Sequence, residues 1–245
     1  MSRIKGSLRS QFLILLGMSA LLPACTTAAP APAPQTVAPE TGTNVIYDDR
    51  FDSVKGEWQQ VSGIWEVLDG HLVQKTDDPR QLNAIRYIQT PRIADASIET
   101  EVRIRPDRPA QWTSSQADEE MRRNIRFIIG AGIVFRMRDT NNFYMFRLAG
   151  EEGAVLGRMI DGQWNEEDLC NPRVRDFLEG SRIGFTADNW YRLKVEVYGN
   201  RITVFINDEP VCSATDNTFG IGNVGLVTFK TPADFDYIKV FNKFQ

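Results

Sequence analysis

Apolar side chains recur at every second position in many segments of this chain. From Ile98 to Arg105, Ile, Thr, Val and Ile alternate with Glu, Glu, Arg and Arg. The same alternation runs through Tyr191–Tyr198 and Arg201–Asn207. A strict period of two is typical of a strand that buries one of its faces. The pattern therefore predicts an all-β fold.

Turn-forming dipeptides separate these segments. Asp69-Gly70 lies between two short apolar runs, and Gly199-Asn200 joins two of the alternating segments, so each dipeptide predicts a hairpin turn. Many short strands with turns between them indicate a two-sheet antiparallel sandwich. Only Asn171–Glu179 is expected to form a helical turn. The remaining strands are predicted at Trp65–Leu68, His71–Gln74, Ile85–Gln89, Phe127–Met137, Phe143–Leu148, Ala154–Ile160, Val211–Ala214, Asn223–Thr228 and Phe235–Asn242.

Residues 1–24 have the features of a secretory signal peptide. Arg3, Lys5 and Arg9 precede an apolar run, Phe12–Leu22, that is too short to span a bilayer. The run ends in Leu-Pro-Ala-Cys25, which resembles the lipobox of bacterial lipoproteins except for its proline. The alternative is an ordinary signal peptide followed by an incidental cysteine.

The lipobox resemblance implies that the Cys25 sulfur is lipidated and that the chain is cleaved before it. Two or more acyl chains hold a protein stably on a membrane. Thr26 follows the cysteine, and by family analogy this favours the outer membrane over the inner one. Residues 25–44 are rich in Pro and Ala and predict an extended linker. One folded domain is then expected over residues 45–245.

Composition excludes some partners. The formal charge is −4, and it becomes more negative once the basic signal segment is removed, so the chain lacks the basic surface that nucleic-acid binding requires. Cys170 and Cys212 would reside in an oxidising compartment after export, which favours a disulfide between them. The alternative is a pair of free, buried thiols.

Four segments in this order resemble concanavalin A-like (laminin G-like) jelly-roll domains. Trp65–Leu72 is similar to the family's W-x-V-x-D-G-x-L opening, and Ala131–Leu148 is similar to its central hairpin. Trp190–Asp208 and Asn223–Val240 resemble its later strands. The resemblance implies a jelly-roll fold. Proteins of this kind include a bacterial group of 3-keto-disaccharide hydrolases. The same fold also occurs in lectins, glycosidases and adhesion domains, so the resemblance does not specify the function.

The sequence favours binding over catalysis. Glycosidases need two carboxylates that face one sugar, and the jelly-roll glucanase motif E-x-D-x-x-E is absent from the sequence. Glu99 and Glu101 share a face with Arg103 and Arg105, which is typical of a solvated, ion-paired stripe. His71, the single histidine, is predicted to face solvent, and the sequence contains no nucleophile elbow.

A basic strip is one candidate ligand-binding site. If Ile133 and Phe135 point into the core, then Arg136, Arg138 and Arg147 point outward together. Guanidinium groups bind carboxylates and sulfates through paired hydrogen bonds, so the strip predicts an acidic glycan or another carboxylate-bearing partner. The alternative is that these arginines form ion pairs with glutamates on neighbouring strands.

Two loop tryptophans are further candidates for ligand binding. Trp112 lies in the long loop Pro106–Asn124, and Trp164 lies in the long loop Asp161–Arg182. Loops of this length are usually functional or mobile. An exposed tryptophan offers a flat platform to a sugar ring. The alternative is that each loop folds back over its own tryptophan.

Asp48, Asp49 and Asp236 form a candidate calcium site, because the first and last strands of this fold often pair and carboxylates are the ligands that calcium prefers. Taken together, the sequence predicts a membrane-anchored lipoprotein whose jelly-roll domain binds carbohydrate or an envelope protein. A glycoside hydrolase of the 3-keto-disaccharide type is the first alternative. A structural subunit of an envelope complex is the second.

Overall fold

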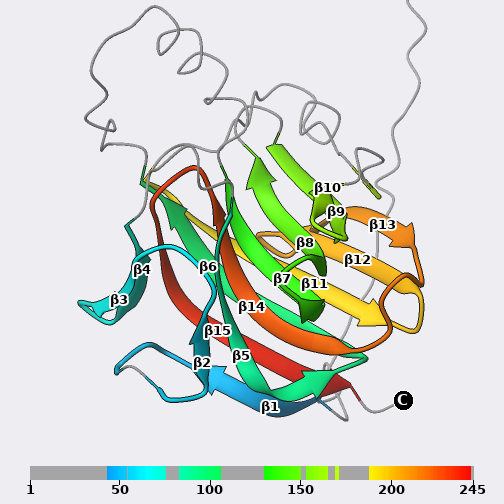
Figure 1. The fold of residues 1–245 in the computed structure, drawn as a ribbon, viewed down its shortest axis with the longest axis horizontal. Helices are drawn as coiled ribbons and strands as arrows, with labels where there is room; N and C mark the ends of the chain where they lie inside the picture. The colour runs from blue at the N-terminus through cyan, green and yellow to red at the C-terminus, as the bar shows by residue number, and fades with distance from the viewer. Residues whose placement is uncertain are drawn as a thin grey trace, which may run out of the picture. The chain divides into compact units, whose positions relative to one another are not determined.

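The computed structural model describes residues 43–53, 55–75, 83–105, 130–149, 153–164, 169–170 and 188–243. All regular structure in these ranges is β-strand, as the alternating pattern predicts (Figure 1). Cys25, the loop Pro106–Asn124 and the helical turn expected at Asn171–Glu179 lie outside the described residues. In the described ranges, no helix has the length and hydropathy needed to cross a membrane.

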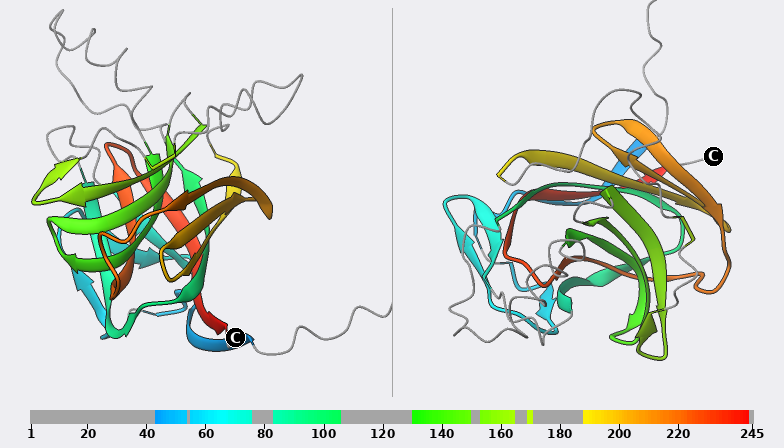
Figure 2. Two further views of the ribbon diagram at one scale, coloured as in Figure 1. Left: turned by 90° about the vertical axis from the view of Figure 1, so that its right-hand side faces the viewer. Right: turned by 90° about the horizontal axis from the view of Figure 1, so that it is seen from above.

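The strands pair antiparallel into two sheets (Figure 2). Sheet A has the order β13-β12-β11-β6-β15-β4-β3, with β1 paired to β15, and sheet B has the order β10-β9-β8-β7-β14-β5-β2. This is the jelly-roll sandwich that the sequence predicts. The strands are β1 (Thr43–Asp49), β2 (Trp58–Gln60), β3 (Trp65–Leu68), β4 (His71–Gln74), β5 (Asn83–Ile93), β6 (Ala96–Ile104), β7 (Gly130–Asp139), β8 (Asn142–Ala149), β9 (Gly153–Ile160), β10 (Gln163–Trp164), β11 (Trp190–Tyr198), β12 (Arg201–Ile206), β13 (Glu209–Thr215), β14 (Gly222–Phe229) and β15 (Ala233–Lys243).

The β3–β4 hairpin forms where its turn dipeptide lies. Asp69 and Gly70 both have positive φ, 51° and 76°, which matches the twist of a two-residue hairpin. Leu68 then pairs with His71. This register directs His71 to the outer face of sheet A and its neighbour Leu72 into the core, because side chains alternate along a strand.

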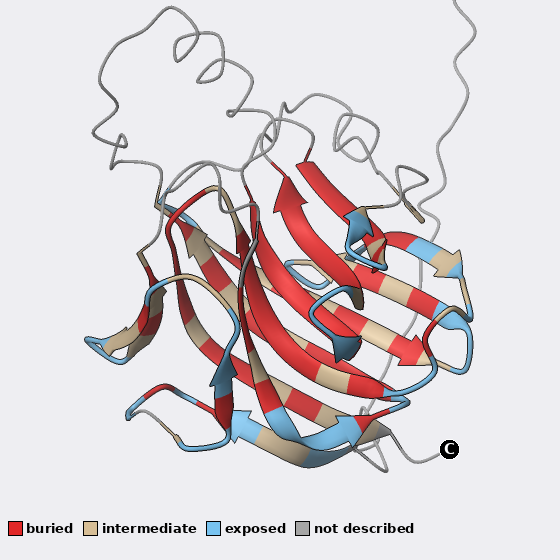
Figure 3. Cartoon of the chain, in the orientation of Figure 1, coloured by how far each residue is buried: buried red, intermediate tan, exposed pale blue. Residues whose placement is uncertain are grey.

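The core lies between the sheets and follows the predicted alternation (Figure 3). In β11, every second residue from Tyr191 to Val197 is buried, and the charged residues between them are half-buried. Phe135, Tyr144 and Phe146 enter the core from sheet B. Each buried aromatic or large aliphatic side chain contributes about 1.5–3 kcal/mol to stability.

The outer faces of the two sheets differ. The outer face of sheet A carries charged residues such as Glu99, Glu101 and Arg192. Sheet B has a second apolar cluster on its outer face, formed by Ile85, Val134, Met137, Phe143, Met145, Met159 and Val227. Because apolar side chains cover both faces of sheet B, nearly every residue of β7 and β8 is buried, and burial does not alternate along these strands.

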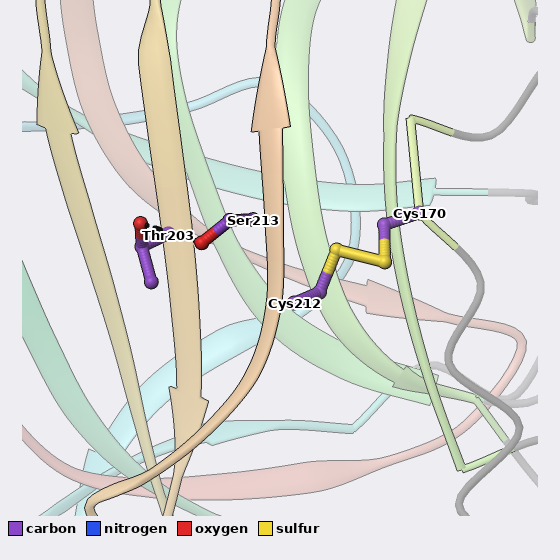
Figure 4. The surroundings of a disulfide bond; sticks show 4 residues. All are labelled: Cys170, Thr203, Cys212 and Ser213. Carbon is purple, nitrogen blue, oxygen red and sulfur yellow. Dashed lines mark hydrogen bonds between the residues drawn. A yellow bond between two sulfur atoms is a disulfide. The ribbon is translucent and has the colours of Figure 1, made fainter. Parts of the chain in front are cut away.

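One disulfide connects the two sheets. Cys212 lies on β13, at the edge of sheet A, and Cys170 forms an isolated bridge with Leu156 of β9 in sheet B (Figure 4). The Cα atoms of the two cysteines are 6.3 Å apart. The disulfide that the export signal predicted is therefore confirmed.

Candidate functional site

Arg136 is buried, with 3% of its surface exposed, so the expectation that it faces solvent is wrong. Its guanidinium donates hydrogen bonds to the carbonyls of Ala94, Phe219 and Gly199, at 2.8 to 3.0 Å, and to Asp95 Oδ1 at 3.1 Å. The cause is a break in the strand pairing between Phe135 and Asp139, where Arg136 adopts a φ of 46°. A bulge of this kind redirects a side chain out of the regular alternation.

The other two arginines of the predicted strip do not join Arg136. Arg138 is exposed at the end of β7, with its guanidinium carbon 5.2 Å from the Phe219 ring centroid. Arg147 is buried on the outer face of sheet B, with its guanidinium carbon 4.8 Å from the Phe229 ring centroid. The structure therefore does not form the continuous exposed basic strip that alternation alone predicted.

Of the two candidate tryptophans, Trp112 lies outside the described residues. Trp164 is half-buried on β10 and packs against the outer apolar cluster of sheet B. It pairs with Met159 of β9 in register. Its ring is therefore engaged in packing and is not the fully exposed platform that the loop position suggested.

The three carboxylates proposed for calcium do not meet. Asp49 is buried, and its oxygens accept hydrogen bonds from Trp58 Nε1 at 2.8 Å and the Phe51 amide at 3.0 Å. Lys55 Nζ lies 3.2 Å from the same carboxylate. Asp236 instead faces a histidine on β4. Among the described residues, no three His, Cys, Asp or Glu side chains are arranged to hold a metal ion.

Glu99 and Glu101 belong to an ion-paired network, as the mixed-charge pattern indicated. Arg192 lies 4.0 Å from Glu99, 3.4 Å from Glu101 and 2.8 Å from Asp208. Glu99 also accepts a hydrogen bond from the Tyr237 hydroxyl at 2.5 Å. Burial and this hydrogen bond raise the pKa of Tyr237. The two glutamates are therefore held by ion pairs and a hydrogen bond on the outer face of sheet A.

A pocket of about 220 Å³ lies on the outer side of sheet A, where β4, β6 and β15 run side by side. We call it the β4–β15 pocket. Arg103, Asp234 and Val73 are consecutive partners across these three strands. The lining residues are Leu68, Asp69, His71, Val73, Gln74, Lys75, Arg103, Arg105, Pro232 and Asp234.

Asp234 is the buried anion of this pocket. Its side chain is 5% exposed, and its Oδ2 accepts hydrogen bonds from Arg103 Nη2 at 2.6 Å and from Arg105 Nη1 at 2.8 Å. Arg103 Nε also donates to Oδ2, at 3.2 Å. Charge-assisted bonds of this kind hold both guanidinium groups in fixed positions, so the pocket has a rigid, polar wall.

Two aromatic rings lie at this pocket: His71 lines it, and Trp190 packs against His71. The His71 imidazole from β4 and the Trp190 indole from β11 stack with their centroids 5.2 Å apart. The Arg103 guanidinium carbon lies 4.6 Å from the Trp190 centroid. His71 Nε2 is 3.4 Å from Asp236 Oδ1, so the imidazole has a carboxylate partner. The site thus combines fixed hydrogen-bond donors with an aromatic surface.

Sequence reasoning placed His71, Arg103 and Arg105 on outward faces but did not bring them together. They come from strands that are distant in the sequence, and only the pairing of β15 with both β4 and β6 aligns them. The only sequence feature that marked Asp234 was its place in the closing motif of the jelly roll, and this motif does not indicate a binding role. Its burial between two arginines is a property of the sheet and not of the local sequence.

Residues 47–240 match the sequence profile of the 3-keto-alpha-glucoside-1,2-lyase-like domain family. None of the curated proteins matches the chain.

Solved structures show the same fold. The carbohydrate binding module CBM66 from Bacillus subtilis aligns with a TM-score of 0.55 and 16% identity, over 74% of this chain and 92% of that one. A β-glucanase from Bacillus licheniformis aligns with a TM-score of 0.52 and 9% identity, over 82% and 98% of the two chains. A lichenase from a mouse hindgut metagenome aligns with a TM-score of 0.50 and 11% identity, over 79% and 97%. The domain is therefore a concanavalin A-like jelly roll.

Proposed function

Because the chain belongs to the 3-keto-alpha-glucoside-1,2-lyase-like family, we propose that it binds carbohydrate in the β4–β15 pocket. The observation that carries this proposal is a cavity lined by Arg103, Asp234 and His71, with Trp190 packed against His71 and Arg103 beside it. Sugars present hydroxyl groups and apolar ring faces at once. A rigid guanidinium–carboxylate wall beside an aromatic surface supplies a complement to both.

The size of the pocket supports a small ligand. Pockets for drug-sized molecules measure roughly 300–1,000 Å³. At about 220 Å³, this pocket fits one sugar unit better than a longer chain. The pocket is open to solvent, so further units of a glycan would extend outward from it.

We also propose that the domain is held at the outer membrane through a lipid on Cys25. The support is the lipobox-like sequence before Cys25 and the Pro- and Ala-rich stretch after it. The Cys170–Cys212 disulfide fits an exported protein, because disulfides persist in oxidising compartments. In cells fed an alkyne fatty acid, the wild-type chain should acquire the label and a Cys25→Ser variant should not.

A glycan-array screen of the full chain, purified in detergent, tests the binding proposal. Retention of particular glycans that is lost in a Trp190→Ala variant is the expected result. A Trp164→Ala variant is the matched control, because this tryptophan packs on the opposite sheet and should leave retention unchanged. Absence of retention for every glycan would refute the proposal and favour a protein partner in the envelope.

A lyase is the second candidate, and the His71–Asp236 pair favours it. In a 1,2-elimination on a 3-keto-glucoside, a base removes the proton from C2, which the adjacent ketone acidifies. The electrons of the C–H bond form a C1–C2 double bond, and the C1–O bond breaks. The leaving oxygen takes a proton, from the protonated base or from water, so that the aglycone departs as an alcohol. The His71 imidazole, which Asp236 Oδ1 approaches to 3.4 Å, is the group positioned to accept the proton. Ultraviolet detection of an unsaturated ketone, absent with His71→Ala, tests this reaction.

A further inference from the structure

The guanidinium groups that line the β4–β15 pocket already have partners within the chain. Asp234 Oδ2 lies 2.6 Å from Arg103 Nη2 and 2.8 Å from Arg105 Nη1. Arg105 Nε also lies 3.6 Å from Asp188 Oδ1. Two guanidinium groups thus face two carboxylates, and this wall of the pocket carries no unbalanced charge toward a ligand.

The other charged groups at the pocket are also paired or lie in water. Lys75 pairs with Glu66, and His71 Nε2 is 3.4 Å from Asp236 Oδ1. Asp69, in the β3–β4 turn, is exposed, so water and salt screen its charge. A charged ligand would have to compete with these existing pairs. The pocket is therefore better suited to a neutral ligand.

The polar wall can still bind hydroxyl groups. Among the described residues, every hydrogen bond to the Asp234 carboxylate ends on Oδ2. The second oxygen, Oδ1, therefore keeps lone pairs that a hydroxyl group of a ligand can use. A hydroxyl group carries one hydrogen to donate and needs no opposite charge to balance it.

An apolar surface lies beside the polar wall. Leu68 and His71 are direct partners across the β3–β4 hairpin, and Val73 is two residues farther along β4. All three side chains therefore lie on the outer face of sheet A. Pro232, between β14 and β15, also lines the pocket. Leu68 is 48% exposed, so a ligand can cover apolar surface there and gain stability by doing so.

We propose that the β4–β15 pocket recognises a 6-deoxy sugar, that is, a hexose whose C6 is a methyl group instead of a hydroxymethyl group. This inference rests on the proposed function of carbohydrate binding. The methyl group contacts Leu68 and Val73, and the ring hydroxyl groups lie toward Asp234. The C6 hydroxyl group of the parent hexose would lose water against the apolar surface without gaining a hydrogen-bond partner.

Calorimetric titration of the full chain in detergent tests the inference with matched pairs of sugars, whose members differ only in the C6 oxygen. The pairs are L-fucose with L-galactose, L-rhamnose with L-mannose, and 6-deoxy-D-glucose with D-glucose. In each pair that binds, we expect the dissociation constant of the deoxy sugar to be about tenfold lower. Differences of this size are typical of one small group in an apolar pocket.

Variants locate the methyl contact. Leu68→Asn should bring the affinity for the deoxy sugar close to the affinity for its parent hexose. Ile221→Asn is the matched control, because Ile221 is equally exposed, at 49%, but does not line the pocket, and this variant should keep the preference. The comparison within each pair needs no variant, so the inference stays testable if Leu68→Asn fails to fold.

Different failures have different meanings. Equal binding within every pair, or tighter binding of the parent hexose, would overturn the deoxy-sugar inference and leave carbohydrate binding in place. If N-acetyl-D-glucosamine binds more tightly than every deoxy sugar, the apolar surface receives an acetyl group and the inference is overturned as well. The inference also falls if the array retains glycans but none of the paired sugars binds. If no sugar binds and no array glycan is retained, both proposals fall.

Discussion

Asp95 and Arg136 form an ion pair, although Asp95 lies in the β5–β6 turn and Arg136 lies on β7. Asp95 Oδ1 accepts a hydrogen bond from Arg136 Nη2 at 3.1 Å and another from the Gly199 amide at 2.9 Å. The Arg136 guanidinium also donates hydrogen bonds to the carbonyls of Ala94, Phe219 and Gly199. One guanidinium group thus joins the β5–β6, β11–β12 and β13–β14 connections at one end of the molecule.

Arg136→Ala is expected to destabilise the domain by about 3 kcal/mol or more. The change leaves several carbonyls without a donor, and an unpaired buried polar group costs about 1–3 kcal/mol. Urea unfolding followed by tryptophan fluorescence measures the loss. Arg138→Ala, at an exposed position on the same strand, should stay within about 0.5 kcal/mol of wild type. Similar values for both variants would contradict the anchoring role of Arg136.

Removal of the disulfide is expected to destabilise the domain by about 4 kcal/mol. The cysteines are 42 residues apart, and the entropy of closing a loop of that length gives this magnitude. The measurement is unfolding of the wild type with and without a reducing agent. A Cys170→Ser/Cys212→Ser variant should match the reduced wild type and should not respond to the reducing agent. A wild type that is equally stable in both conditions would show that the bond contributes nothing.

Gln74→Met is expected to stabilise the domain by about 1–3 kcal/mol. Gln74 is fully buried, and neither polar atom of its amide has a hydrogen-bond partner among the described residues. Methionine has a similar length and removes this penalty. Gln163→Met, at an exposed position, is the control and should have little effect. A destabilised Gln74→Met would indicate that the amide has a partner in solution, and glycan binding by this variant should then be measured.

Stability is expected to fall between pH 10 and about 12. Burial, followed by the charges of Glu196 and Asp95, raises the pKa of Tyr198 to about 12. The folded state therefore keeps this proton after the unfolded chain has lost it near pH 10. The stabilisation is complete below pH 10 and is lost as the pH rises toward 12. Melting temperatures at pH 9 and pH 11.5 should differ less in Tyr198→Phe than in wild type, and an equal drop would exclude Tyr198 as a cause.

Most of the fold was predictable because its signal is local. Alternation along β6, β11 and β12 identifies one buried face from the sequence of each strand alone. The turn at Asp69-Gly70 needs positive φ at both positions. Asp and Gly adopt this conformation more readily than most residues, so the turn can be recognised from the dipeptide itself. The antiparallel pairing of β1 with β15 also agrees with the expectation for the first and last strands.

The candidate site was less predictable because it depends on distant contacts. The bulge at Arg136 leaves no mark in the alternating pattern, yet it turns the side chain from the surface into the interior. From the sequence, Asp49 was expected to be free to bind an ion. In the fold, its carboxylate accepts a hydrogen bond from Trp58 and pairs with Lys55. The meeting of His71 with Trp190 requires the order of four neighbouring strands, which no single segment encodes.

The disulfide also lies where both sheets would otherwise end in open edges. β13 is the last strand of sheet A, and the Cys170 segment covers β9 beyond the short strand β10 of sheet B. Unpaired edge strands are templates on which other chains add and aggregate. By fastening the two edges to each other, the Cys170–Cys212 bond leaves less free backbone for strand addition.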